Sequence, residues 1–295
     1  MIPNLKKVII GTAHFGTKYG INGKKENFEN IKYIINYLNK NRVEIIFDCS
    51  DDYQNSFKFL KKLIKKKRFK FKIIYKIKIN KNLNNKKTLE NFLLSKIKKI
   101  SSFFNLNYKN IILMSHNENI INNKNLYLLH EVLVNFKKKK NIYNFGYSIY
   151  NFQKLKKKIF SFKPDVLQLP FNIADRSVSN NDLIFLKKRN IKIHVRSIFL
   201  QGLLMTKSNE LPKRFMKFKK YWKIFENNLE KFKMNREDCL LDHVFNNKII
   251  DNVVIGYTNV SQLKLIKKIK SQNFKNLFPK IKSSSEKKYL LRPYN

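Results

Sequence analysis

The sequence predicts an α/β fold, a (β/α)8 barrel that forms one domain over residues 1–295. Short β-rich segments alternate with amphipathic, lysine-rich segments, and no Gly/Ser-rich or Pro-rich linker divides the chain. This alternation is typical of parallel βαβ units. The chain holds eight β-rich segments, and eight such units close naturally into a barrel, which usually needs about 250 residues.

The competing architecture is an open, doubly wound parallel sheet. Such a sheet usually carries the phosphate-binding fingerprint G-x-G-x-x-G after its first strand. Residues 11–16 read GTAHFG, which does not fit that pattern, and no G-x-x-x-x-G-K-[ST] loop occurs in the sequence. Because both fingerprints are missing, the barrel is the favoured architecture.

The expected elements follow from β-rich runs and from the helical periodicity between them. Strands are expected at residues 8–10, 44–48, 70–77, 110–115, 142–147, 166–169, 191–196 and 253–256. Helices are expected at residues 28–39, 56–66, 89–104, 125–136, 151–159, 182–188 and 260–269. The longer segment 222–245 is expected to contain two helices before the last strand.

The chain carries 63 Lys and Arg against 20 Asp and Glu, a net charge of +43. The excess is lysine, with only eight arginines, and Asn, Ile, Phe and Tyr are abundant too. Lysine and these four residues have A/T-rich codons, so a base-biased genome with solvated helix faces explains the composition. A functional basic surface is the alternative. Because nucleic-acid recognition favours Arg, we expect no specific nucleic-acid partner, only weak binding that collapses with moderate salt.

Other features of the chain favour a cytoplasmic protein. No apolar run approaches the roughly 18 residues of a membrane span, and the first residues lack the pattern of a signal peptide. The two cysteines, Cys49 and Cys239, form no C-x-x-C or Cys/His ligand pattern, so neither a metal site nor a disulfide framework is predicted. We expect no membrane partner, and the sequence predicts no particular oligomeric state.

Four ionisable residues lie at the expected ends of three successive strands. Asp48 ends the second strand, Tyr53 follows it by five residues, Lys76 lies near the end of the third strand, and His116 directly follows the fourth. In a (β/α)8 barrel the active site is built where the strands end. We therefore expect these side chains to converge on one rim as a catalytic set.

Two of these assignments have rivals nearby. Lys78 lies two residues beyond Lys76 and on the same face of the expected strand. Asp48 could instead cap a helix, and Asp51 or Asp52 could be taken for the site carboxylate. Lys76 is preferred to Lys78 because it directly follows a β-rich run.

Seven segments match short patterns in chain order, and such an ordered set is far more specific than any single pattern. Residues 9–16 with 19–21 resemble LGTAQFGxxYGI, and 47–56 resemble DTAxxYGxSE with Asp48 at its first letter. Residues 113–117 resemble LLLHNP, 146–150 resemble GVSxY, 166–172 resemble VQxPxN, 195–204 resemble VRSxFLQGLL, and 253–256 read VVIG. Together they resemble the aldo/keto reductases, in a bacterial branch of the family that is linked to sugar metabolism.

The resemblance implies a barrel enzyme that reduces a small-molecule carbonyl, in this branch a sugar or sugar-derived aldehyde or ketone, with NADPH or NADH. It also implies a catalytic tetrad of Asp48, Tyr53, Lys76 and His116. Tyr53 would be the general acid, with a pKa lowered toward neutral pH by Lys76. Asp48 would hold Lys76 in place and charged, and His116 would donate a hydrogen bond to the carbonyl oxygen.

The resemblance also implies positions for the cofactor. Ser148, Gln168 and Asn172 match residues that hold the carboxamide or shape the nicotinamide pocket. Ser197 and Gln201 match the segment along the pyrophosphate, and Gly256 and Thr258 match the phosphate-binding turn before the last helix of the barrel, whose N-terminus favours anions. NADPH is the favoured cofactor because lysines are common near that helix, with NADH as the alternative.

Some positions depart from the family pattern. Gln54 replaces the glycine after the catalytic tyrosine, Phe57 replaces a glutamate, and Ile266 replaces the asparagine expected near the adenine. The arginine that often binds the 2′-phosphate of NADPH in the family is not evident, and Lys264 is the cation close to its position. Two rival functions stay open: a lyase- or epimerase-type reaction that uses bound cofactor transiently, and a basic binding protein on a retired enzyme scaffold.

Overall fold

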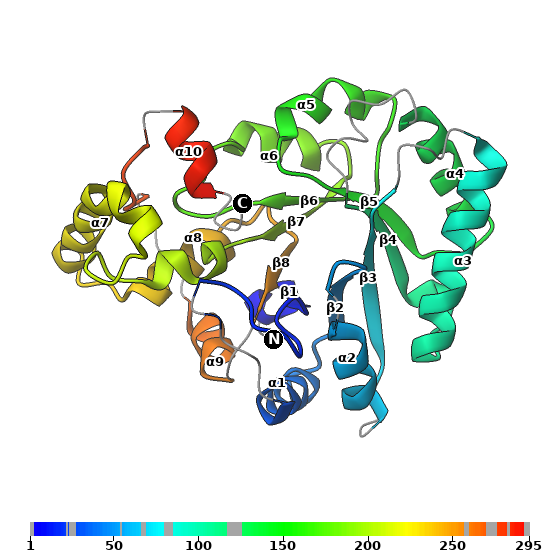
Figure 1. Cartoon of the computed structure of the whole chain (residues 1–295), viewed down its shortest axis with the longest axis horizontal. Helices are drawn as coiled ribbons and strands as arrows, with labels where there is room; N and C mark the ends of the chain where they lie inside the picture. Colours follow the sequence, from blue (N-terminus) through cyan, green and yellow to red (C-terminus); the bar gives the residue numbers. More distant parts are fainter. Residues whose placement is uncertain are drawn as a thin grey trace.

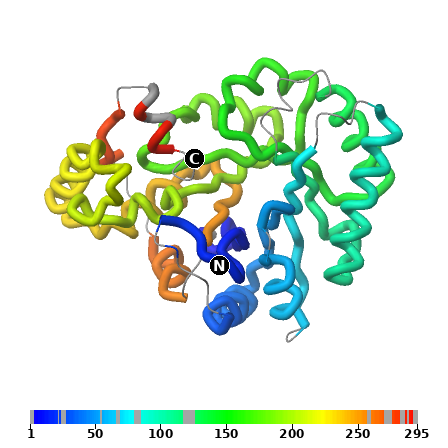
Figure 2. The backbone as a smooth tube through the Cα atoms, viewed as in Figure 1, coloured from blue at the N-terminus to red at the C-terminus, as the bar shows by residue number. Residues whose placement is uncertain are grey.

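The computed structural model of the chain describes residues 3–21, 23, 28–53, 55–65, 69–79, 85–116, 126–256, 260–269, 276–281 and 284–291. Eight parallel strands form a closed barrel in the order β1 to β8, and β1 pairs with β8. The helices lie outside the strands, and the chain passes once around the barrel from β1 to β8 (Figures 1 and 2). The predicted (β/α)8 barrel is therefore confirmed.

The strands agree with the expected segments to within two residues at each end. They are β1 (Val8–Gly11), β2 (Ile45–Ser50), β3 (Phe71–Ile77), β4 (Ile111–Ser115), β5 (Asn144–Ser148), β6 (Val166–Pro170), β7 (Lys192–Arg196) and β8 (Asn252–Ile255). Two ends matter for the site. Strand β2 continues past Asp48 to Ser50, and β8 stops one residue before Gly256.

The helices also follow the expected order. They are α1 (Phe28–Lys40), α2 (Ser56–Lys65), α3 (Lys86–Phe104), α4 (Leu126–Lys138), α5 (Phe152–Lys156), α6 (Asn180–Lys187), α7 (Lys219–Lys231), α8 (Arg236–Phe245), α9 (Val260–Lys268) and α10 (Ser284–Leu291). The segment expected to contain two helices does so, as α7 and α8. Short 3-10 helices are η1 (Pro3–Lys7), η2 (Tyr108–Asn110), η4 (Lys158–Phe160), η5 (Leu200–Met205) and η6 (Lys213–Phe218).

The inside of the barrel is filled by alternate residues of each strand, because successive side chains of a strand point to opposite faces. One buried cluster inside the barrel consists of Ile9, Ile74, Ile112, Met114 and Val166. The intervening residues of the strands pack outward against the helices in a much larger cluster. The apolar inner layer gives the polar residues further along each strand a rigid support.

A separate hydrophobic cluster lies beside the barrel, where α7, α8 and α10 gather at the left of Figure 1. Trp222, which is fully buried, belongs to this cluster and contacts Phe278 edge to face. Helix α10 joins this cluster through Leu290, and its Tyr289 hydroxyl donates to the carbonyl of Arg214 at 3.3 Å. Of the helices in the described ranges, none combines the length and the apolar character that a bilayer crossing requires.

Candidate active site

The register of the strands brings the polar inner residues together at the carboxyl end of the barrel. Ser50 of β2 lies beside Lys76 of β3, and Ser148 of β5 lies beside Gln168 of β6. Inner positions alternate, so Ile74 and Lys76 face the barrel interior while Tyr75 faces the helices. The same alternation that fills the core thus places a lysine inside the rim.

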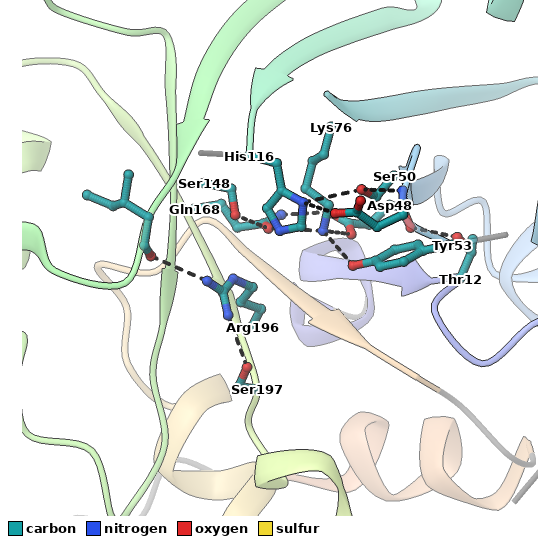
Figure 3. Close-up of polar contacts among 12 residues, drawn as sticks. Thr12, Asp48, Ser50, Tyr53, Lys76, His116, Ser148, Gln168, Arg196 and Ser197 are labelled. Carbon is teal, nitrogen blue, oxygen red and sulfur yellow. Dashed lines mark hydrogen bonds and ion pairs between the residues drawn. The ribbon is translucent and has the colours of Figure 1, made fainter. Parts of the chain in front are cut away.

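The ammonium of Lys76 is the centre of the site (Figure 3). It donates to Asp48 Oδ1, to the Tyr53 hydroxyl at 3.0 Å and to Gln168 Oε1 at 3.5 Å. Lys76 and Asp48 are each 1% exposed. Buried charges persist only when they are paired and hydrogen-bonded, and this pair meets both conditions.

The Tyr53 loop is held by backbone and side-chain hydrogen bonds on both sides. The Tyr53 amide donates to the carbonyl of Ser50 at 3.0 Å. On the other side, Ser56 donates to the Tyr53 carbonyl through its amide at 2.9 Å and through its hydroxyl at 2.8 Å. Because Ser56 is the first residue of α2, the helix start fixes the direction in which Tyr53 leaves the loop.

The tyrosine next to Lys76 in sequence supports the same loop from the outer face of β3. The Tyr75 hydroxyl donates to Asp51 Oδ1, and Lys96 of α3 forms an ion pair with Asp51 Oδ2 at 2.7 Å. The Asp51 amide donates to the Lys76 carbonyl at 3.2 Å. Asp51 therefore anchors the loop to β3 and α3 and does not take part in the contacts of the Lys76 ammonium.

The protonation of Tyr53 differs from the expectation. Burial raises the pKa of Tyr53, and the charge of Lys76 offsets this effect only in part, so the pKa lies above its ordinary value. For Lys76, burial alone would lower the pKa, but the contacts with Asp48 and Tyr53 have the larger combined effect. The pKa of Lys76 is therefore raised, and the ammonium stays charged. The expectation that Lys76 brings the phenol pKa toward neutrality was wrong for this state, because the desolvation of the phenolate dominates.

His116 is a neutral imidazole in this site. Burial, together with the charges of Lys76 and Arg196, lowers the pKa of His116 to about 3. Its Nδ1 lies 3.2 Å from the Ser50 hydroxyl and 3.5 Å from Asp52 Oδ2. Since the ring is uncharged at neutral pH, its approach to Asp52 is not an ion pair there.

Two of the three rivals for the tetrad positions, Lys78 and Asp52, pair with each other at the edge of the site. Lys78 Nζ lies 2.9 Å from Asp52 Oδ1, and the Lys78 side chain is 61% exposed. Strand β3 ends at Ile77, so Lys78 leaves the barrel wall. The Tyr53 hydroxyl is contacted by Lys76 and not by Lys78, within the part of the chain that the structure describes.

Two of the predicted cofactor residues are joined to the buried charges. Gln168 Nε2 donates to Asp48 Oδ2 at 2.6 Å, and Ser148 Oγ donates to Gln168 Oε1 at 3.1 Å. Both side chains are buried at the barrel mouth (Figure 3). The structure thus brings Ser148 and Gln168 to the tetrad, and Gln168 holds Asp48 by its second oxygen.

Of the remaining predicted cofactor residues that the structure describes, Asn172, Ser197 and Gly256 follow strands β6, β7 and β8, and Gln201 lies in η5. Asn172 is buried and bound within the protein, since its Nδ2 donates to the Ser197 carbonyl at 3.1 Å and its Oδ1 accepts two backbone amides. Ser197 and Gln201 have left-handed backbone, with φ of 61° and 55°. Gly256 directly follows β8, where a side chain would meet the ring of His14 at 3.0 Å. Thr258 and Gln54 lie outside the described residues.

Gln201 connects two loops across the mouth. Its Nε2 donates to the Tyr19 hydroxyl at 3.1 Å, and its carbonyl accepts from the Ile21 amide at 3.0 Å. The loop after β1 and the loop after β7 are therefore tied to each other. Ile266, where the family pattern has a polar residue, is fully buried in the hydrophobic core and offers no polar group.

The geometry of the site and the sequence as a whole point to one family. The sequence model described as "Aldo/keto reductase family" matches residues 7–272. That range holds all eight strands and the four residues Asp48, Tyr53, Lys76 and His116. The chain belongs to the aldo/keto reductase family. Its members reduce carbonyls, and this aldo/keto reductase is an NAD(P)H-dependent oxidoreductase.

Solved structures of other aldo/keto reductases have the same fold. The holo form of an aldo-keto reductase from Bacillus halodurans is 14% identical and has a TM-score of 0.65, over 97% of this chain and 91% of that chain. A glycerol dehydrogenase from Gluconobacter oxydans is 15% identical and has a TM-score of 0.63, over 97% of this chain and 90% of that chain. At these identities the likeness concerns the fold. Among curated protein sequences, none matches the chain.

The sequence did not predict the roles of several residues that build this aldo/keto reductase site. Asp51, Tyr75 and Lys96 hold the Tyr53 loop, and Ser50 contacts His116. The alternation of inward and outward side chains along β3 is the sequence signal that could have shown that Tyr75 faces away from Lys76. No sequence signal marks the pairing of Asp51 with Lys96, because it depends on how α3 packs against the loop.

The buried histidines of this aldo/keto reductase make its stability sensitive to acid. Burial lowers the pKa of His116 to about 3 and the pKa of His194 and His243 to about 4. In the unfolded chain they titrate near 6.5, so below that pH the unfolded state binds more protons and is favoured. Asp242, whose pKa burial raises to about 6, opposes this in part by taking up a proton in the folded state.

We therefore expect the free energy of unfolding to fall as the pH is lowered from 7 to 5, by on the order of 1 kcal/mol per buried histidine before the offset of Asp242. Urea denaturation at pH 7, 6 and 5 measures the change, and His194→Gln reduces the pH slope if His194 contributes to it. Equal or greater stability at pH 5 would contradict the account.

Proposed function

We propose that the chain reduces an aldehyde or ketone, a sugar or sugar-derived carbonyl, with NADPH as the preferred cofactor and Tyr53 as the general acid. The observation that carries the proposal is the contact of the Tyr53 hydroxyl with the buried, charged Lys76 at 3.0 Å, at the carboxyl end of a barrel. A phenol beside a cation in a buried site can donate a proton to a developing alkoxide.

The residues around the mouth fit a nicotinamide dinucleotide. Ser148 and Gln168 lie beside the tetrad and would line the nicotinamide end. Gly256 lets the His14 ring approach the backbone closely after β8, and the first turn of α9 contains no acidic residue. The N-terminus of a helix favours anions, so this end of the barrel would take the phosphates, with Lys264 of α9 as a cation for a 2′-phosphate.

When bound, the reduced cofactor supplies the hydride that the carbonyl carbon accepts. Tyr53 donates its hydroxyl proton to the carbonyl oxygen, and the Lys76 ammonium stabilises the phenolate that remains. Asp48, bound to Lys76 and to Gln168, keeps the ammonium charged and in place. The neutral ring of His116 donates a hydrogen bond that orients and polarises the carbonyl.

The test is consumption of reduced cofactor with a panel of sugar aldehydes, simple aldehydes and ketones, together with binding titrations of NADPH and NADH. We expect oxidation of NADPH that depends on both enzyme and carbonyl, and tighter binding of NADPH than of NADH. Replacing Lys264 by Met should narrow the difference in affinity between the two cofactors, while replacing the exposed Lys220 by Met serves as the matched control. Tighter binding of NADH by tenfold, about 1.4 kcal/mol, would reverse the cofactor preference, and no consumption with any carbonyl would count against the proposed reaction.

A further inference from the structure

We propose that Ser50 is a positioning residue that holds His116 in the tautomer with the proton on Nε2, the form that can donate to the substrate carbonyl. The inference rests on the proposed function for its consequence in catalysis, but the tautomer itself is a property of the free protein. The Ser50 hydroxyl is not part of the four-residue tetrad.

The contacts of the Ser50 hydroxyl determine where its proton goes. Ser50 is 1% exposed, so water does not satisfy its hydroxyl. The backbone amide of Asp52 donates to Ser50 Oγ at 3.3 Å, and Ser50 Oγ lies 3.2 Å from His116 Nδ1. In the described part of the chain, Nδ1 is thus the acceptor within reach of the Ser50 proton.

The alternative tautomer would leave this hydroxyl without an acceptor. If Nδ1 carried the ring proton, Ser50 Oγ would accept from both the Asp52 amide and the ring, and its own proton would point at no acceptor among these groups. A buried donor without a partner is strongly disfavoured. With Nδ1 as the acceptor, the Asp52 amide donates to the Ser50 hydroxyl and the Ser50 hydroxyl donates to the imidazole. Each of these groups then has a partner, and Nε2 carries the ring proton.

Asp52 is the competing partner, because its carboxylate would favour a proton on Nδ1. Its Oδ2 lies 3.5 Å from Nδ1, farther than the Ser50 hydroxyl. Lys78 draws the same carboxylate away, with Nζ 2.9 Å from Oδ1. The ring is neutral at physiological pH because burial lowers the pKa of His116, so one of its two nitrogens carries the only ring proton and the choice matters.

The hydroxyl is a feature of this chain. The family pattern DTAxxYGxSE has alanine at the position of Ser50, and alanine cannot bond to the histidine. Here the two neighbouring acids, Asp51 and Asp52, follow directly, and Asp52 places a carboxylate near Nδ1. We infer that Ser50 counteracts this carboxylate.

The experiment is long-range ¹H–¹⁵N NMR of the ¹⁵N-labelled full chain at pH 7.5, with the His116 signals assigned from a His116→Gln sample. We expect the protonated nitrogen of His116 to be Nε2 in the wild type. In Ser50→Ala, the Nδ1–H form should become the major one, and Asp52→Asn added to that variant should restore Nε2–H. Ser50→Thr, which keeps the hydroxyl, should retain the wild-type pattern.

Ser115→Ala is the matched control. Ser115 directly precedes His116, is buried, and its hydroxyl has no hydrogen-bond partner in the described part of the structure, so its removal should leave the tautomer unchanged. Because the NMR pattern requires no turnover, it decides the proposal even if carbonyl reduction is not found. A wild-type ring protonated on Nδ1, or an unchanged tautomer in Ser50→Ala, would overturn it.

Turnover then tests the consequence. If the carbonyl is reduced, kcat of Ser50→Ala should fall by about fivefold, the size of effect that one neutral hydrogen bond has on an equilibrium. The KM for NADPH should stay the same, because Ser50 lies on the substrate side with His116. An unchanged kcat in a variant whose tautomer has switched would contradict the positioning role.

Discussion

Tyr53→Phe is expected to lower kcat for carbonyl reduction by about 10²–10⁴-fold, the usual contribution of a general acid. The substitution removes one hydroxyl and keeps the ring, so the loop contacts of the Tyr53 backbone with Ser50 and Ser56 remain. Cofactor affinity should therefore change little. The measurements are kcat across pH and the dissociation constant of NADPH.

Tyr143→Phe is the matched control, because it removes the hydroxyl of an exposed tyrosine that directly precedes β5, at the amino end of the barrel. Its kcat should match the wild type. Because the pKa of Tyr53 lies above its ordinary value, the phenol stays protonated through mildly alkaline pH, and its titration should not reduce wild-type kcat between pH 7 and 9. A near-normal kcat in Tyr53→Phe would remove Tyr53 from the mechanism.

Lys76→Met is expected to have the second large effect, on both turnover and stability. Without the ammonium, the phenolate left after proton donation loses its stabilising charge, and kcat should fall by about 10²-fold or more. The Asp48 carboxylate would also remain buried without its partner cation. Breaking a buried ion pair in this way typically costs about 3–5 kcal/mol of stability.

Two further variants separate these effects. Lys78→Met removes an exposed pair with Asp52 and should change stability by less than about 1 kcal/mol, with a kcat far above that of Lys76→Met. Asp48→Asn in the Lys76→Met background removes the unpaired charge, so it should recover part of the stability and none of the turnover. Urea denaturation and kcat measure both. A larger loss of kcat in Lys78→Met than in Lys76→Met would show that the structure assigns the wrong lysine.

Much of the site follows from simple periodicities in the sequence. The alternation of β3 places Lys72, Ile74 and Lys76 on one face, and the end of the strand at Ile77 separates Lys76 from Lys78. Asp48 is predictable in the same way from β2. The positions of these side chains on the inner face could be predicted because a strand has a fixed period and a barrel has only one inner face.

Other features depend on packing between distant segments and could not be predicted. Lys96 reaches Asp51 from a helix 45 residues along the chain, and no local pattern fixes that distance. The raised pKa of Tyr53 depends on burial by the whole rim, whereas the sequence showed only the neighbouring lysine. Helix α10 was not expected, because its few buried residues pack against a cluster outside the barrel.

In the reaction that we propose, this site transfers a hydride from NADPH to a carbonyl, with net oxidation of the cofactor. The most direct measurement uses NADPH deuterated at the transferring position of C4 and an aldehyde that the chain reduces, with mass spectrometry of the alcohol. The account predicts one deuterium on the former carbonyl carbon for each NADPH oxidised, and loss of this product in Tyr53→Phe. Conversion of substrate without label and without net cofactor oxidation, as a lyase or epimerase would give, would contradict it.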